Sequence, residues 1–193
     1  MNIYQSICVF CSSSDAISND YKKSAFELGC KLAERNIKLI YGGGKIGLMG
    51  EVSKAVFQNN GYIIGVIPKA LHRDGIFYKN ANEMIITDSM HERKKVMRDL
   101  SDAFIALPGG FGTIEETLEI ITLKQLRYHK KPIVIFNQNG FYDFLLKQFA
   151  VLFKENFTKN GYSSLYYEAK KIDDIFIYLN NYRYQITEDK WFS

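Results

Sequence analysis

SDAFIALPGGFGTIEE, residues 101–116, is the stretch that decides the fold of this chain. The apolar run 103–107 has the length of a buried strand and leads without a polar break into the glycine-rich segment 108–112. Apolar residues then recur over 114–124 as they do in a helix packed on a sheet, and we expect Thr113 to cap that helix. The stretch therefore predicts a strand, a glycine loop and a helix in direct succession.

This loop has the properties of an anion site. Closely spaced glycines let backbone N–H groups approach a ligand, and a helix N-terminus adds unpaired donors and a partial positive charge. A tight turn without any ligand is the alternative, and a GGxG pattern alone does not decide between the two. We expect Glu115 and Glu116 in the first helical turn, where they would repel a phosphate unless one of them acts on another part of the ligand. The helix dipole offers a simpler explanation of acidic residues at this place.

The rest of the chain alternates in the same way. Strands are expected at 3–10, 37–41, 62–66, 83–87 and 132–136, with a short edge strand within 161–169. Helices are expected at 19–35, from the glycine-rich loop 42–50 to 59, and at 88–98, 141–155 and 172–181. This alternation predicts an α/β fold with a doubly wound parallel sheet flanked by helices, in a single domain over 1–193. Ligands bind such sheets outside the carboxyl ends of the strands, so the loops that follow the strands should converge.

Composition excludes several classes of protein. Apolar residues make up 47% of the 193 residues and charged residues 24%, and no apolar run approaches the about 20 residues of a membrane helix. The first ten residues lack the pattern of a signal peptide, so we expect a cytoplasmic protein without a membrane partner. The net charge of +4 is too small to indicate nucleic acid. The three cysteines have no metal-ligand spacing, and no metal site is expected.

Two further loops follow predicted strands. Ser13 lies in a run of small hydroxyl residues after the first strand, where serines serve either a ligand or only the turn. Gly43 and Gly44 belong to the loop 42–50 after the second strand, which is neither the GxGxxG fingerprint nor a Walker loop. Two glycine-rich strand-to-helix loops in one domain favour a ligand. The aromatic residues Trp191 and Phe192 pack either on their own domain or on a partner.

Basic residues begin the helix expected at 88–98. Arg93 and Lys94 lie in its first two turns, where positive charge opposes the helix dipole, and this is a reason to look for an anionic partner. A solvated basic face is the alternative, and for Lys94 taken alone it is the better interpretation. A phosphate cradle, a guanidinium and a free carboxylate suit a sugar phosphate whose N-glycosidic bond breaks, because a carboxylate stabilises the oxocarbenium-like cation. Plain nucleotide binding is the alternative. No pattern of a nucleophilic triad occurs in the sequence.

Three motifs carry a resemblance to a known family. PGGFGTIEE at 108–116, MHERK at 90–94 and YGGGKIGLMG at 41–50 resemble PGGxGTxxE, MHxRK and GGGxxGLMG of the LOG ("Lonely guy") family, in the family's order and spacing. The similarity runs from about residue 7 to about residue 144. Members are cytokinin riboside 5′-monophosphate phosphoribohydrolases, often misnamed lysine decarboxylases. The resemblance implies a Rossmann-like fold, a homodimer, no cofactor, and release of a free base and ribose 5-phosphate from a nucleoside 5′-monophosphate.

The resemblance also assigns residues. It places the catalytic pair on Arg93 and Glu116, and Asp74 stands in place of a family glutamate in a loop of different length. Ser12 and Leu123 depart from residues that many members have. From the loops after the strands and from the resemblance together, we expect these substrate contacts: Ser13, Gly43, Gly44, Asp74, Lys94, Gly109, Gly110, Phe111, Gly112, Thr113, Ile114, Glu115 and Thr122.

Three interpretations therefore stand at this point. The chain is a phosphoribohydrolase, a nucleotide-binding module with little turnover, or an amino acid decarboxylase, which would require a lysine that carries pyridoxal phosphate. Both of the first two need the same phosphate loop, so only an assay separates them. The preferred base and the role of Glu116, as nucleophile or as electrostatic stabiliser, are left open by the sequence.

Overall fold

A seven-stranded parallel sheet forms the centre of the protein, in a computed structural model that describes residues 4–185. Trp191 and Phe192, for which the sequence predicts docking, lie outside the described residues. The strand order is β4-β3-β2-β1-β5-β6-β7, and each neighbouring pair is parallel. The strands are β1 (Ser6–Phe10), β2 (Lys38–Tyr41), β3 (Ile63–Pro68), β4 (Glu83–Thr87), β5 (Ala103–Ala106), β6 (Ile133–Phe136) and β7 (Tyr167–Ala169).

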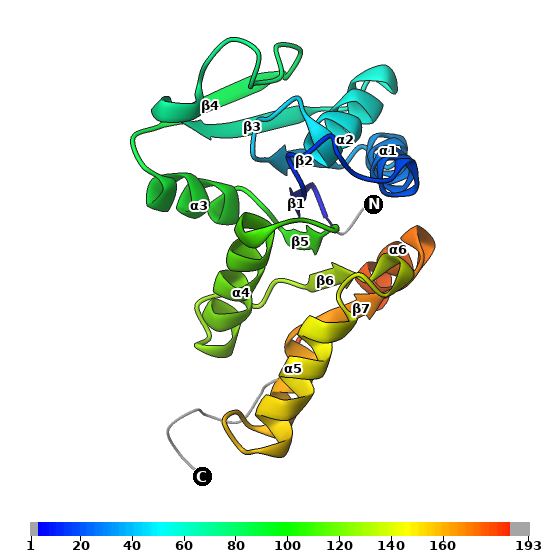
Figure 1. Ribbon diagram of the computed structural model, residues 1–193, viewed down its shortest axis with the longest axis vertical. Helices are drawn as coiled ribbons and strands as arrows, with labels where there is room; N and C mark the ends of the chain where they lie inside the picture. Colours follow the sequence, from blue (N-terminus) through cyan, green and yellow to red (C-terminus); the bar gives the residue numbers. More distant parts are fainter. Residues whose placement is uncertain (1–3, 186–193) are drawn as a thin grey trace.

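Helices cover both faces of this sheet (Figure 1). They are α1 (Asn19–Glu34), α2 (Gly47–Gln58), α3 (Met90–Asp99), α4 (Phe111–Gln125), α5 (Asp143–Lys154) and α6 (Ile172–Asn181), with the short 3₁₀ helices η1 (Lys69–Leu71), η2 (Gln138–Gly140) and η3 (Asn160–Leu165). One buried cluster joins the sheet to α1, α2 and α6, and two others join it to α3, α4 and α5. The predicted doubly wound sheet is confirmed. In the part of the chain described, no helix is both long and apolar enough to cross a bilayer.

Strand β1 shows why the sequence alternates as it does. Ile7 and Val9 face the cluster under α1 and α2, whereas Cys8 and Phe10 face the cluster under α3 and α4. Both faces of the strand are buried, as in parallel sheets whose crossover helices cover each side, so every residue of the strand is apolar or small. The chain moves outward from β1 in one direction through β4 and returns to the other side at β5. The order of the strands therefore reverses between β1 and β5.

The start of α4 differs from the prediction. The helix begins at Phe111 with Gly110 as its N-cap, and no side chain caps it. The prediction that Thr113 caps the helix is wrong, because Thr113 is already its third residue and its buried side chain lies against Gly109. Glu115 and Glu116 accordingly lie in the second turn, and the first turn contains no acidic residue. The expected repulsion between these carboxylates and an anion at the helix end is therefore reduced.

Helices α1 and α2 pack closely on one face of the sheet. A Cβ atom at Gly29 of α1 would lie 2.5 Å from the carbonyl oxygen of Val52 and 2.6 Å from the Cβ atom of Ala55, both on α2. Real Cβ atoms do not approach other atoms so closely, so only glycine permits this separation of the two helices. The contact fixes α2, and with it the loop that precedes α2.

We predict that Gly29→Ala destabilises the protein by about 1–3 kcal/mol, the usual cost of overpacking a core, although alanine is the better helix former. The measurement is the free energy of unfolding in urea. Gly161→Ala is the matched control, because a Cβ atom at Gly161 meets nothing within 4 Å. Equal stability of the two variants would show that α1 and α2 separate without cost.

Candidate active site

A cavity of about 550 Å³ opens at the carboxyl ends of β1, β2 and β5, beside the point where strand order reverses. This is the usual ligand position in an open α/β sheet, and the volume suits a nucleotide-sized ligand. The structure brings part of the predicted site together here. The predicted residues that line the cavity are Ser13, Gly44, Arg93, Gly110, Phe111, Gly112, Thr113, Glu115 and Glu116.

The N-terminus of α4 offers free backbone donors to this cavity. The first intrahelical hydrogen bond runs from the N–H of Ile114 to the carbonyl oxygen of Gly110, at 3.1 Å. The N–H groups of residues 111–113 precede this bond and have no partner within the helix. Nothing lies within 4 Å of the Cβ positions of Gly110 and Gly112, so an anion has access to the helix end. The helix dipole adds a partial positive charge, and a phosphate fits this end of the cavity.

The second glycine loop is constructed differently. At the start of α2 the N–H of Gly47 donates to Asp15 Oδ1 at 3.0 Å, and the N–H of Met49 donates to the carbonyl oxygen of Ser12 at 3.2 Å. Gly47 has a φ of +65°, and a Cβ atom there would lie 2.6 Å from the carbonyl oxygen of Ser14. These donors of α2 are therefore used to hold the loop after β1. Of the two loops, the one before α4 is the better phosphate cradle.

Arg93 and Glu116 form a buried ion pair on the wall of the cavity. Arg93 Nη1 lies 2.6 Å from Glu116 Oε1, and Arg93 Nε donates to the carbonyl oxygen of Val66 at 2.9 Å. The two residues are only 6% and 7% exposed. Gly42 leaves the necessary space, because a Cβ atom there would collide with Nη2 of Arg93. The guanidinium is thus fixed by α4, β3 and the end of β2 at once.

Burial determines the protonation behaviour of Glu116. Desolvation raises the pKa of its carboxyl group, and the charge and hydrogen bond of Arg93 oppose that rise without cancelling it. A carboxylate of this kind is a stronger base than an exposed one, and it lines the cavity into which the N-terminus of α4 opens. It can accept a proton, stabilise a cation or attack an electrophilic carbon. Cys11 lines the same cavity, but burial raises the pKa of its thiol, which keeps the thiol neutral.

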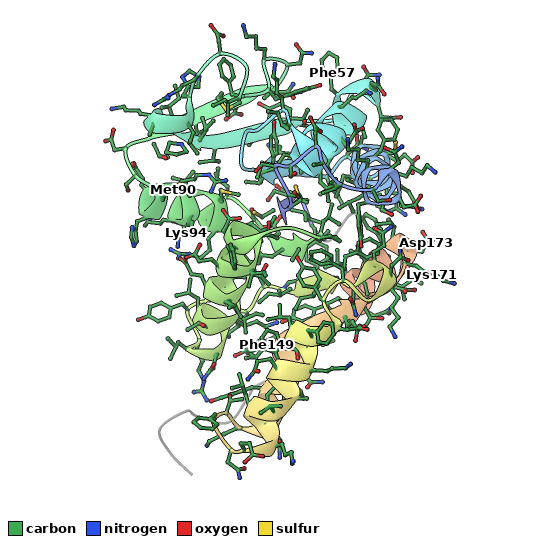
Figure 2. All side chains as sticks on the ribbon, viewed as in Figure 1. Phe57, Met90, Lys94, Phe149, Lys171 and Asp173 are labelled. Atoms are coloured by element: carbon green, nitrogen blue, oxygen red, sulfur yellow. The ribbon has the colours of Figure 1, made fainter. Side chains whose placement is uncertain are left out.

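Lys94 lies beside the cavity and not on its wall. It forms ion pairs with Glu115 and Glu119 of α4, and its side chain is 14% exposed. Burial lowers the pKa of Lys94, but the hydrogen bonds and charges of these two carboxylates outweigh that effect and leave the pKa raised. Figure 2 marks Met90 and Lys94 on α3, close to α4. Lys94 therefore joins the two helices that carry Arg93 and Glu116.

Two predicted glycines support the loops from behind. Gly43 has a φ of +75°, and a Cβ atom there would lie 3.3 Å from Ile67 Cβ and 3.2 Å from Met84 Sδ. Gly109 lies beneath the side chain of Thr113. Neither residue lines the cavity, and each gives its loop the shape that brings the next glycine to the cavity wall.

Three other predicted residues lie away from the cavity. Asp74 is exposed and pairs with Lys79 at 3.0 Å. Thr122 is exposed on α4, and its Oγ1 donates to the carbonyl oxygen of Leu118 at 2.8 Å. Ile114 packs with the buried cluster under α5. The structure of this single chain does not bring these three side chains to the Arg93–Glu116 pair.

An apolar wall of the cavity was missed by the sequence reasoning. It consists of Met49, Ile67, Leu71, Ile76 and Met90. The last three are 36–47% exposed although they are large and apolar. A signal was present, because apolar residues in the polar excursion 69–82 and at the start of a helix are unexpected on a solvated surface.

Backbone contacts hold part of that excursion over the second glycine loop. The N–H of Tyr78 donates to the carbonyl oxygen of Gly43 at 2.9 Å, and the N–H of Lys45 donates to the carbonyl oxygen of Ile76 at 2.9 Å. Gly44 and Phe77 also form an antiparallel bridge. Between residues 4 and 185, no cluster of His, Cys, Asp and Glu side chains is suited to a metal ion.

Comparisons with known proteins show the family of this chain. The family model described as "Possible lysine decarboxylase" matches residues 49–179. The cytokinin riboside 5′-monophosphate phosphoribohydrolase LOG1 of Arabidopsis thaliana is 49% identical over 154 residues, which are 80% of this chain and 72% of LOG1. The enzyme LOG of Oryza sativa subsp. japonica is 42% identical over 179 residues, 93% of this chain and 74% of that one. The chain belongs to the LOG family.

A solved structure supports the fold alone. The molybdenum cofactor binding protein of Rippkaea orientalis has a TM-score of 0.70 and 19% identity, with 93% of this chain and 98% of that chain covered. At this identity the likeness concerns the arrangement of strands and helices.

We predict opposite effects for two adjacent glycines of the α4 loop. Gly109→Ala should destabilise the fold by about 1–3 kcal/mol, because its methyl group would fall on the buried side chain of Thr113. Gly110→Ala should leave the free energy of unfolding within about 0.5 kcal/mol of the parent. It should nevertheless weaken the binding of AMP about tenfold, because its methyl group obstructs the α4 donors. Urea unfolding and calorimetric titration with AMP measure the two effects, and unchanged affinity in Gly110→Ala would exclude the loop as the phosphate cradle.

Proposed function

We infer that the protein is a phosphoribohydrolase, which cleaves the N-glycosidic bond of a cytokinin riboside 5′-monophosphate to give the free base and ribose 5-phosphate. The observation that carries this inference is the buried Arg93–Glu116 pair on a cavity wall next to the free N-terminus of α4. The relatives named for this activity, at 42–49% identity, support it.

The geometry supports separate binding positions for the phosphate and for the ribose of the substrate. The N-terminus of α4 would bind the 5′-phosphate, which places the ribose along the second turn of the helix, at Glu116. As the bond between C1′ and the base nitrogen breaks, its electron pair leaves with the base and positive charge develops on the ribose. The Glu116 carboxylate would stabilise that charge or bond to C1′. Water would then supply the hydroxyl group at C1′, and its remaining proton would go to the nitrogen of the released base. Arg93 would hold Glu116 in position.

The base would lie against the apolar wall of the cavity. Met90 stands at the start of α3, and Leu71 and Ile76 come from the excursion after β3, so two separate segments present apolar side chains. When an apolar group of a ligand covers apolar side chains that are half exposed in the free protein, removal of their surface from water contributes favourable free energy to binding. This wall supports a purine with an apolar N6 substituent, the chemistry of a prenylated cytokinin, as the preferred substrate over plain AMP.

Amino acid decarboxylation is supported less well. That reaction needs a lysine to carry pyridoxal phosphate. None of the described residues that line the cavity is a lysine, and the nearby Lys94 is engaged by Glu115 and Glu119. A binding module without turnover would not require a buried carboxylate with a raised pKa at the sugar position.

A homodimer is part of the proposal. Family resemblance implies it, and the surface between α4 and α5 supports it: Leu118 on α4 and Phe157 just after α5 are exposed by 38% and 82% and line the same groove. Thr122, Phe149 and Phe153 line a groove of about 260 Å³ between these two helices. Exposed apolar residues gathered in this way mark a protein interface more often than open surface. A second copy of the chain is the proposed occupant.

We predict that Glu116→Gln and Arg93→Ala each lower kcat for base release by at least about 100-fold, as loss of a group that stabilises the transition state does. The assay is chromatographic detection of free base and ribose 5-phosphate from isopentenyladenosine monophosphate, with AMP, GMP and CMP for comparison. Adenosine is the unphosphorylated control. Lys147→Met, on the exposed side of α5, is the control variant.

The pH profile adds a second measurement. Because burial raises the pKa of Glu116, activity that needs the carboxylate should fall, on acidification, at a pH above the ordinary value of 4.5 for glutamate. Turnover of adenosine at the rate of the monophosphate would contradict the phosphate cradle. If Glu116→Gln kept the activity of the parent, Glu116 would have no part in the mechanism. If the folded parent were inactive on every monophosphate, the protein would be a nucleotide-binding module instead of a hydrolase.

We predict that the purified protein has the mass of a dimer by light scattering, and that Leu118→Glu shifts it to a monomer because a charge would be buried in the interface. Ile177→Glu is the matched control, since Ile177 is 60% exposed on α6, away from this surface. A monomeric parent would exclude the dimer. A dimer that Leu118→Glu leaves intact would place the interface on another surface.

A further inference from the structure

Lys124 is a buried lysine that the proposed reaction does not use. It is 2% exposed near the end of α4, and its Nζ donates to the carbonyl oxygen of Leu165 at 2.8 Å. No ion pair joins Lys124 to a carboxylate within residues 4–185, and desolvation alone lowers its pKa to about 8. An ammonium group has three donors, so this one retains donors beyond its single bond to the backbone. Buried cations without a counter-charge are rare because desolvation is costly.

The ammonium group lies at a cavity of its own. This cavity has a volume of about 340 Å³ and is lined by Lys124, Leu165 and Arg183 together with tyrosines from β7, α6 and the segment after α6. Tyr167 and Tyr178 stack at 4.3 Å between ring centroids with 5° between their planes. The Nζ atom of Lys124 lies 5.0 Å from the ring centroid of Tyr182. A cation and flat aromatic walls therefore meet in one space of ligand size.

We propose that this cavity is a second binding site, which takes a small aromatic carboxylate. The carboxylate would supply the counter-charge of Lys124 and occupy its remaining donors, with Arg183 at the cavity wall as a second cation. The ring would pack among the tyrosines, as aromatic rings do in offset or edge-to-face contacts. A phosphate is the poorer fit, because no helix N-terminus faces the cavity: α4 and α6 both end near it.

The site is separate from the proposed hydrolase centre. Lys124 follows Glu116 by eight residues on α4, about 12 Å along the helix axis at 1.5 Å per residue. The cavity lies near the amino ends of the strands, beside the residue that precedes β7, whereas the other cavity lies at their carboxyl ends. Binding at one site can therefore be measured without turnover at the other.

The test is calorimetric titration of the full chain with 4-hydroxybenzoate, with neutral 4-hydroxybenzamide and inorganic phosphate as comparison probes. We expect one carboxylate bound per chain, and at least tenfold weaker binding of the amide and of phosphate. Lys124→Met keeps the apolar stem and should lower carboxylate affinity at least tenfold. It should still fold, since replacing an unpaired buried charge by an apolar residue is often neutral or stabilising. Lys147→Met, a surface lysine over Phe144, should bind as the parent does.

A second variant and a pH series complete the test. Tyr167→Leu removes part of the aromatic wall, leaves the cation in place, and should also weaken carboxylate binding. Affinity should fall as the pH rises through about 8, because Lys124 loses its charge there, while the buried His129 nearby, with its pKa lowered to about 4, is already neutral. Absence of carboxylate binding, or parent affinity in Lys124→Met, would overturn the site and leave Lys124 as a donor to Leu165 alone. Equal binding of phosphate or of the amide would overturn the proposed class of ligand.

Discussion

The buried pair of Arg93 and Glu116 is the interaction on which the arrangement of this edge of the sheet depends. Its two partners come from α3 and α4, and the guanidinium also donates a hydrogen bond to the carbonyl oxygen of Val66, near the end of β3. A buried ion pair gains little net stability, because the attraction is offset by the cost of removing both charges from water. The fold therefore supplies the stability elsewhere, in the apolar clusters on both faces of the sheet. What the pair supplies is the position of one carboxylate.

Several features of the neighbouring chain follow from this constraint. Gly42 has no side chain at the place where the guanidinium passes, and Lys94, the next residue of α3, pairs with Glu115 and Glu119 of α4. Arg93 and Met97, one turn apart, are the buried residues of α3. The buried face of this helix accordingly carries one charged and one apolar side chain. The polar composition that makes it resemble a surface helix in the sequence is the composition its position requires.

The sequence predicted most of the fold because its signals are local. The strand β4 at Glu83–Thr87 and the helix α6 at Ile172–Asn181 lie where periodicity and flanking polar residues place them. The cap of α4 was mispredicted, because a threonine after glycine has the pattern of an N-cap whether or not the glycines continue the helix. At the site, the convergence of the segments that carry Arg93 and Glu116 follows from parallel strands, and the family resemblance names the two residues as a pair. Its burial does not, since burial depends on Val66 and Gly42 in other segments.

Non-local features explain the remaining differences. Lys124 lies on the buried face of α4, four residues after Ile120, and a lysine is accommodated there because η3 and the chain after α6 close over the end of the helix. The apolar wall formed by Leu71 and Ile76 likewise depends on backbone bonds such as that from Tyr78 to Gly43. Such contacts join residues that are tens of positions apart, and no periodicity within either segment encodes them.

The cradle at the start of α4 consists of backbone groups, whereas the apolar wall opposite consists of side chains from a loop and a helix end. A recognition surface made of N–H groups tolerates substitution wherever the glycine geometry is retained, but a wall made of Leu71, Ile76 and Met90 changes with every substitution. In the proposed complex, the two halves of the substrate therefore contact parts of the chain that can vary independently. A lineage could then exchange one base for another through a few mutations in the wall, while the N-terminus of α4 and the buried carboxylate stay as they are.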